Sequence, residues 1–125
     1  MKSYYQQKKN GFLLDDNIYA KTVREIQCYN TYKKIVRDIN NKSPIDITEN
    51  DVINKSLAEK YIEIFDNTLV KWVDEDYREC VFNHVVNKII YEELEEEYYL
   101  SISCIKRWVQ VYVYGVAVEL GEDFR

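Results

Sequence analysis

The chain has 125 residues, of which 46% are hydrophobic, and a formal net charge of −5 at pH 7. This length allows one compact domain with a core, while three glycines and one proline are too few for a sandwich or barrel made of many hairpins. No apolar run is long enough to span a membrane and the first residues do not resemble a signal peptide, so we expect a cytoplasmic protein with no membrane contact.

The N-terminal third is basic and the middle of the chain is acidic. Residues 1–42 hold nine Lys or Arg against four acids, whereas residues 43–105 hold five against fifteen. We expect residues 1–14, which are polar with little periodicity, to form a mobile tail. A helix from about residue 17 to 40 should follow, and we divide the chain after residue 42 into a basic tail with its helix and a helical domain, 43–125. Its expected apolar stripe is Tyr19, Val23, Ile26, Tyr29, Tyr32, Val36 and Ile39.

Two further helices are predicted by their start signals. Pro44 closes the first helix, because the residue before a proline avoids the helical region. Thr48-x-x-Asp51 resembles a capping box, which predicts a second helix through Ile53, Leu57, Tyr61, Ile64 and Phe65. The acids from Asp74 to Asp76 suit the positive end of a helix dipole and predict a third. That helix would place Tyr77, Val81, Val85 and Ile89 on one face.

The C-terminal segment predicts two helices separated by a short turn. The first runs over 91–98, and Ser101 then caps a helix that continues to about Leu120, before Gly121 in the left-handed conformation. The alternating residues from Val109 to Tyr114 would also suit a strand, but the cap and the helical spacing favour a helix. This last helix is apolar almost all round, so it needs burial on two sides, either against the N-terminal helices or against a second subunit, and a homodimer is the simplest arrangement.

The span 73–124 resembles the C-terminal region of RinA-type phage transcriptional regulators, which is similar to the helix-turn-helix of region 4 in bacterial sigma factors. Three pieces carry the resemblance: Asp76-Tyr77-Arg78, then Ser101-x-x-Cys104-Ile105-Lys106-Arg107-Trp108, then Val116-Ala117-x-x-Leu120-Gly121. Two positions depart from the family. Glu95 stands where a small residue is usual, so it must swing outward or spread the helices, and Cys104 stands where threonine is commoner.

The resemblance implies a phage or prophage regulator of transcription in a bacterial or phage-infected cell. Its fold would be all-α, a small helical domain with a helix-turn-helix at about 91–120 and a long apolar last helix. That helix would enter the major groove of double-stranded DNA, with Ser101 and Lys106 at phosphates and Ser103, Arg107 and Gln110 nearer base edges. Because two cations alone bind weakly, we expect the basic N-terminal segment or a partner to add phosphate contacts. RNA polymerase or another protein would be a further partner.

The remaining candidate residues have ordinary structural explanations. Cys28, Cys80 and Cys104 are too far apart for a zinc pattern and are expected to be buried. His84 is expected in the core or at its boundary, because no second histidine or cysteine lies at ligand spacing. The five glutamates between residues 92 and 97 are expected on a solvated face, although they could dock a basic partner. The twelve tyrosines fit an interaction surface and semi-buried filling equally well.

We expect no catalysis, no metal and no cofactor. The three glycines are isolated, so no phosphate-binding loop is present, and no nucleophile is paired with His84 in a known motif. A different class of function remains open beside DNA binding. In that alternative the chain is an acidic helical protein–protein interaction module, and the residues at 101–110 serve only packing.

Overall fold

The structure, a computed structural model, describes residues 6–122 and is all-α, as predicted, with no strand among those residues. The helices are α1 (Asp16–Gln27), α2 (Tyr29–Asn40), α3 (Glu49–Trp72), α4 (Arg78–Val85), α5 (Tyr91–Tyr98) and α6 (Ile102–Glu119). Single 3-10 turns occur at η1 (Lys8–Asn10), η2 (Pro44–Asp46) and η3 (Glu75–Tyr77). No helix in the described range is both long and apolar enough to cross a membrane.

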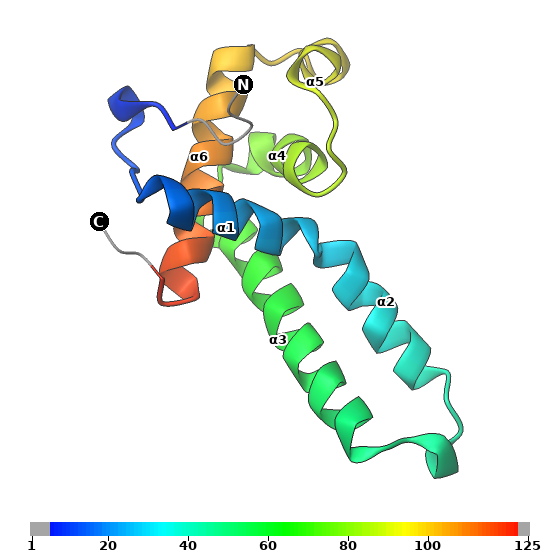
Figure 1. The fold of residues 1–125 in the computed structure, drawn as a ribbon. Coiled ribbons are helices and arrows are strands. Elements are labelled where there is room, and N and C mark those ends of the chain that lie inside the picture. Colours follow the sequence, from blue (N-terminus) through cyan, green and yellow to red (C-terminus); the bar gives the residue numbers. More distant parts are fainter. Residues whose placement is uncertain (1–5, 123–125) are drawn as a thin grey trace.

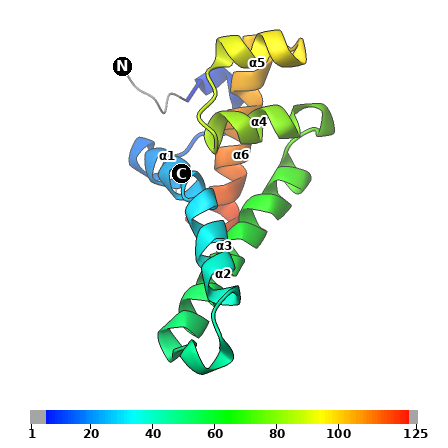
Figure 2. The same cartoon turned by 90° about the vertical axis from the view of Figure 1, so that its right-hand side faces the viewer.

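Helix α6 is the centre of the fold, and the other elements surround it (Figure 1, Figure 2). Helices α1, α3, α4 and α5 all pack against it, and every residue from Val109 to Ala117 is buried. A helix is therefore formed where the alternating sequence also suited a strand. The chain itself covers all sides of this segment, so the apolar circumference that led us to expect a homodimer has an intramolecular explanation.

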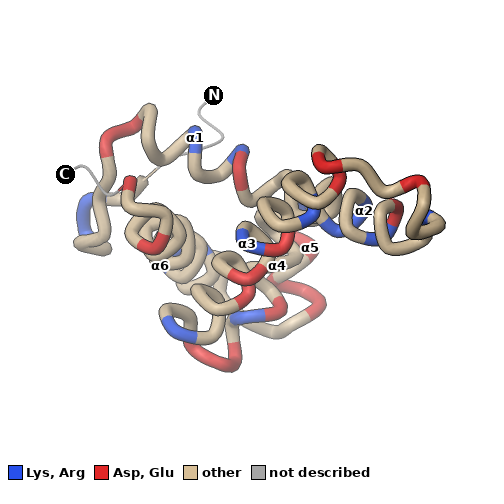
Figure 3. Tube along the Cα trace, turned by 90° about the horizontal axis from the view of Figure 1, so that it is seen from below, with Lys and Arg blue, Asp and Glu red and all other residues tan. Residues whose placement is uncertain are grey.

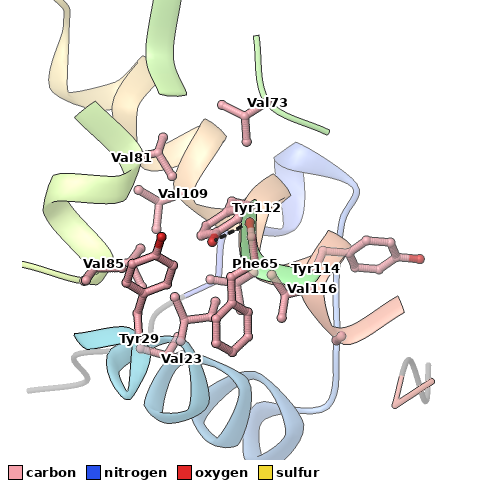
Figure 4. Packing of buried hydrophobic residues seen from close by; sticks show 14 of the residues in the cluster. Val23, Tyr29, Phe65, Val73, Val81, Val85, Val109, Tyr112, Tyr114 and Val116 are labelled. Atoms are coloured by element: carbon pink, nitrogen blue, oxygen red, sulfur yellow. Dashed lines mark hydrogen bonds between the residues drawn. The ribbon is translucent and has the colours of Figure 1, made fainter. Parts of the chain in front are cut away.

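The core combines residues from both sides of residue 42. Phe65 of α3 and Tyr112 of α6 are fully buried, and the Tyr112 hydroxyl donates a hydrogen bond of 3.1 Å to the Phe65 carbonyl (Figure 4). Val23 and Tyr29, from α1 and α2, pack against the same cluster. Helix α1 therefore buries apolar surface in the same core, and this burial is the main stabilising contribution to folding.

Helices α2 and α3 form an antiparallel hairpin, here called the arm, which projects away from α6 (Figure 1). Tyr32 and Tyr61 stack at 5.2 Å between ring centroids, and Ile39, Ala58 and Ile62 are buried. The expected stripe on α3 is therefore wrong at its start, since Ile53 is 55% and Leu57 is 49% exposed. In the arm α3 packs on α2 alone. Only the face of α3 toward α2 is therefore covered, and apolar residues on its other faces stay in solvent.

The single helix expected over 17–40 is two helices, which meet at Cys28. The backbone there has φ −79° and ψ 1°, outside the regular helix, and the chain changes direction. The same apolar stripe changes partner at this point, because α1 packs on α6 whereas α2 packs on α3. The spacing of apolar residues in the sequence does not show that the helix they lie on changes the helix it packs against.

The predicted helix boundaries are otherwise confirmed where capping residues mark them. Thr48 and Asp51 form the capping box at the start of α3, and Ser101 caps α6 by accepting from the Cys104 amide at 3.3 Å. Gly121 has φ 75°, the left-handed conformation expected after the last helix. The predicted third helix is shorter than expected, because α4 ends at Val85 and Ile89 lies in the link to α5.

Gly115 is a position of α6 that should not accept a larger side chain. A β-carbon there would lie 2.6 Å from Cγ of Trp72, whose ring packs on the helix from α3. We expect Gly115→Ala to lower the free energy of unfolding by about 1–2 kcal/mol, because overpacking outweighs the gain in helix propensity of up to about 1 kcal/mol. Chemical denaturation measures this change.

A double variant provides the control for this prediction. In a Trp72→Ala background the β-carbon has room, so Gly115→Ala should become neutral or stabilising there. Equal destabilisation in both backgrounds would contradict the close approach.

Candidate nucleic-acid interface

Helix α5, a three-residue turn and α6 form the C-terminal unit that the sequence predicted. Leu94, on α5, is fully buried and holds the helix to the core. Tyr99 ends α5 with φ 57°, and its amide donates to the Glu95 carbonyl at 3.0 Å. Two residues later Ser101 caps α6, so the turn has a defined conformation at both ends.

Helix α4 fixes both ends of α5. At the C-terminal end, the Asn83 amide donates to the Tyr98 hydroxyl at 2.7 Å, and this hydroxyl donates to Glu79 at 2.9 Å. Burial, then the hydrogen bond to the Glu79 carboxylate, raises the pKa of Tyr98 to about 12. At the N-terminal end, His84 stacks on Tyr91 with 3.9 Å between ring centroids. The α5–α6 unit is thus supported by a third helix.

The first two turns of α6 extend beyond the core and expose four of the five predicted site residues. Ser101, Ser103, Lys106 and Arg107 are exposed, while Ile105 between them is fully buried. The Lys106 ammonium lies 5.3 Å from the centre of the Tyr91 ring, and the Arg107 guanidinium 5.5 Å from the Trp108 ring. Both cations therefore extend along aromatic surface and keep their charged ends accessible.

Trp108 supports this exposed face from behind. Its side chain is half-buried and its ring lies 5.8 Å from that of Tyr77, between centroids, in the turn before α4. The tryptophan therefore faces inward while its two basic neighbours face solvent.

Gln110 does not belong to the exposed face, which corrects its expected role near base edges. It is 2% exposed, and its amide makes four hydrogen bonds to the segment before α1. Its Oε1 accepts from the Gln7 amide at 2.8 Å and from the Asn10 side chain at 3.1 Å. Its Nε2 donates to the carbonyls of Gln7 at 3.1 Å and Phe12 at 2.9 Å. A buried amide with all these partners is a structural residue.

The same contacts correct the expectation of a mobile tail over residues 1–14. Residues 6–14 are packed against α6, with Leu14 buried and its backbone paired with the Gln6 side chain at 2.9 Å in both directions. Residues 1–5 lie outside the described part of the chain. The polar composition of this segment suggested a mobile tail. The residue that holds the segment, a single buried glutamine about 100 residues away, cannot be recognised from the sequence.

The sequence analysis expected phosphate contacts from the basic N-terminal segment as a whole but did not single out Lys8 and Lys9. They directly follow Gln7, which Gln110 holds, and both are exposed. Gln110 lies four residues after Lys106 and three after Arg107, so it is one helical turn from each. The contact therefore brings two more cations to the neighbourhood of the exposed turns of α6.

Acidic residues flank the site on α5. All five glutamates between residues 92 and 97 are exposed, and Figure 3 shows acidic residues in red and basic residues in blue along the trace. Glu95 points outward, so the close crossing does not bury its charge. In the described part of the chain no three His, Cys, Asp or Glu side chains are grouped so that they could hold a metal ion.

The histidine prediction is confirmed, but the cysteine prediction is only partly right. His84 is half-buried at the core boundary, and its Nδ1 lies 2.8 Å from the Ile89 carbonyl. Cys80 is buried, Cys28 is half-buried, and Cys104 is exposed because the first turn of α6 extends past the core. Hydrogen bonding with Ser101 and then Tyr77 lowers the pKa of the Cys104 thiol.

Comparison with protein-family models, curated proteins and solved structures finds no match to this chain.

Gln110→Ala should release the segment before α1. Removing the side chain leaves buried backbone groups without partners, so we expect a loss of about 1–3 kcal/mol in unfolding free energy. Amide exchange of residues 6–14 should accelerate, whereas exchange in α3 should change little. Hydrogen exchange measured by NMR tests both expectations.

Gln110→Glu is the matched variant, because it keeps the size of the side chain but removes its two donors. It should accelerate exchange in the same segment. Unchanged exchange of residues 6–14 in both variants would contradict the structural role of Gln110.

Proposed function

We propose that this chain is a DNA-binding regulator of transcription, of phage or prophage type, that inserts the start of α6 into the major groove. One observation carries the proposal. The N-terminal turns of α6 extend out of the core with Ser103, Lys106 and Arg107 exposed, while α4 and α5 hold the helix from behind. A recognition helix presents its N-terminal residues to base edges in this way, and the preceding helix lies across the backbone.

Each exposed side chain suits a particular contact. Arg107 can donate two parallel hydrogen bonds to the O6 and N7 acceptors of guanine, and Ser103 can donate to or accept from either base of a pair. Ser101 and Lys106, at the edge of the same face, suit phosphate oxygens. The four residues thus divide into two that select a sequence and two that position the helix.

Electrostatics determine which other parts of the chain contribute. With a net charge of −5 the protein needs a local basic surface, and the α5 glutamates repel phosphates unless they face away from the duplex. Lys8 and Lys9 supply two further cations near α6. The glutamates then remain available to a basic protein surface, such as one on RNA polymerase, in a bacterial cytoplasm or a phage-infected cell.

A protein–protein interaction module is the second candidate, and the arm favours it. Ile45, at its tip, is 90% exposed, and Val52, Ile53 and Leu57 on α3 are also in solvent. Exposed apolar groups gathered on a projecting element are typical of a surface that binds another protein. In this alternative the exposed turns of α6 have no nucleic-acid partner.

A salt titration of binding to mixed-sequence duplex DNA separates the two candidates. For the DNA-binding protein, affinity should fall steeply with salt, and Lys106→Ala with Arg107→Ala should reduce the slope of log K against log salt by about 1, because Lys106 contacts phosphate. Each lost contact should also weaken binding by about 1–3 kcal/mol. Fluorescence anisotropy with a labelled duplex measures both quantities.

The control has the same change of charge elsewhere. Lys55→Ala with Lys60→Ala, on α3 in the arm, should leave the slope close to that of the unaltered protein. No detectable affinity at low salt, or an equal effect of the two double variants, would favour the interaction module. Selection of bound sequences from random duplexes then tests whether Arg107 specifies a guanine.

A further inference from the structure

A pocket lies between α1, α4, the link from α4 to α5, and α6. Its volume is about 340 Å³, at the lower end of the range for small-molecule sites. Val23, Val85 and Val109, which Figure 4 labels, form part of its apolar wall. His84 and Tyr91, stacked on one another, contribute an aromatic wall. Apolar walls of this kind favour the flat faces of an aromatic ring.

Two tyrosine hydroxyls that have no hydrogen-bond partner among the described residues belong to side chains that line this pocket. Tyr19 lines it and is 3% exposed, and its hydroxyl has no hydrogen-bond partner among the described residues. In the described part of the chain no sealed side-chain oxygen lacks a partner, so this hydroxyl is not fully sealed, and it belongs to a side chain that lines the pocket. The Tyr91 hydroxyl likewise has no partner among the described residues. Burial, then the neighbouring Tyr91, raises the pKa of Tyr19, so it remains a neutral donor.

His84 adds an uncharged acceptor. Its Nδ1 faces the Ile89 carbonyl, which can only accept, so this nitrogen carries the proton in the neutral ring. Burial lowers the pKa of His84 and favours that neutral form. Nε2 is therefore a bare acceptor, and it has no partner among the described residues.

The charge of the pocket is set by Lys88. It is exposed and lines the pocket, and no acidic residue is among the described residues that do so. An anionic ligand would thus meet one ammonium group and no carboxylate. We propose that this pocket binds a small aromatic carboxylate, with the ring against the apolar wall, the carboxylate at Lys88, and a polar substituent hydrogen-bonded to the hydroxyls of Tyr19 and Tyr91.

Titration of the full chain with benzoate and 4-hydroxybenzoate, followed by NMR of the backbone amides, tests the site. Saturable shifts are expected in α1, α4 and the link at 86–90, with 4-hydroxybenzoate binding more tightly than benzoate. Benzamide, a neutral molecule of the same shape, should bind at least about fivefold more weakly than benzoate, because it lacks the charge for Lys88.

Two substitutions with matched controls assign the contacts. Tyr19→Phe removes a hydroxyl that has no partner among the described residues, so the fold should persist while 4-hydroxybenzoate binds several-fold more weakly. Lys88→Asn, which tolerates the φ of 58° at this position, should abolish the preference for benzoate over benzamide. Tyr61→Phe and Lys55→Asn, in the arm, are the controls and should leave all affinities unchanged.

The proposal fails if neither carboxylate gives saturable shifts at these residues up to about 20 mM, near the weak end of fragment affinities. It also fails if benzamide binds as tightly as benzoate, or if the arm variants reduce binding as much as Tyr19→Phe does. Each outcome concerns ligand binding alone and does not depend on whether the protein binds DNA.

The position of the pocket gives its ligand a regulatory role, and this part of the inference rests on the proposed DNA binding. Ile89 and Ile90, in the link that sets α5 against α4, line the pocket together with Tyr91, the first residue of α5. Lys106 of α6 lies over Tyr91. At a concentration that saturates the unaltered protein but not Lys88→Asn, 4-hydroxybenzoate should therefore change the affinity of the unaltered protein for duplex DNA more than that of the variant. Saturable ligand binding with unchanged DNA affinity would overturn the regulatory role and leave the site intact.

Discussion

The fold depends on the burial of α6 on all sides. Its central residues, 109–117, have no face that could be left in water, so the remaining elements must enclose them. Helix α3 approaches α6 closely where Trp72 lies over Gly115. The Tyr112 hydroxyl of α6 donates a hydrogen bond to a backbone carbonyl of α3. Helices α1 and α4 close the other sides. Because the central residues of α6 are held in the core, the N-terminal turns of this helix can extend into solvent and remain helical.

Gln110 links this core to the exposed end of α6. An amide buried among valines is costly unless all its hydrogen-bonding groups are paired, and here the segment before α1 provides the partners. The same pairing fixes the segment that carries Lys8 and Lys9 against α6. A residue that the sequence assigned to DNA contact thus contributes indirectly, because it determines where other cations lie.

Two surfaces remain outside this core, and they differ in character. The arm carries apolar side chains in solvent, whereas α5 carries five exposed glutamates. Both lie on elements that contact the core along one side only. The pocket beside α5 is different again, since it is lined by apolar side chains together with tyrosine hydroxyls that lack partners in the described chain. Its position against the α4–α5 link connects it physically to the helix that braces α6.

The sequence alone determined the helical class, the capped starts of α3 and α6, the turn between α5 and α6, and the exposure of Lys106 and Arg107. These follow from local chemistry, because caps, spacing and chain direction act within one or two turns. Only the tertiary structure decided the break at Cys28, the exposure of Ile53 and Leu57, and the role of Gln110. Each of these depends on which element packs against the residue, and that partner lies tens of residues away in the sequence. From the sequence a glutamine is expected on the surface, and only the fold shows that carbonyls and amides surround Gln110.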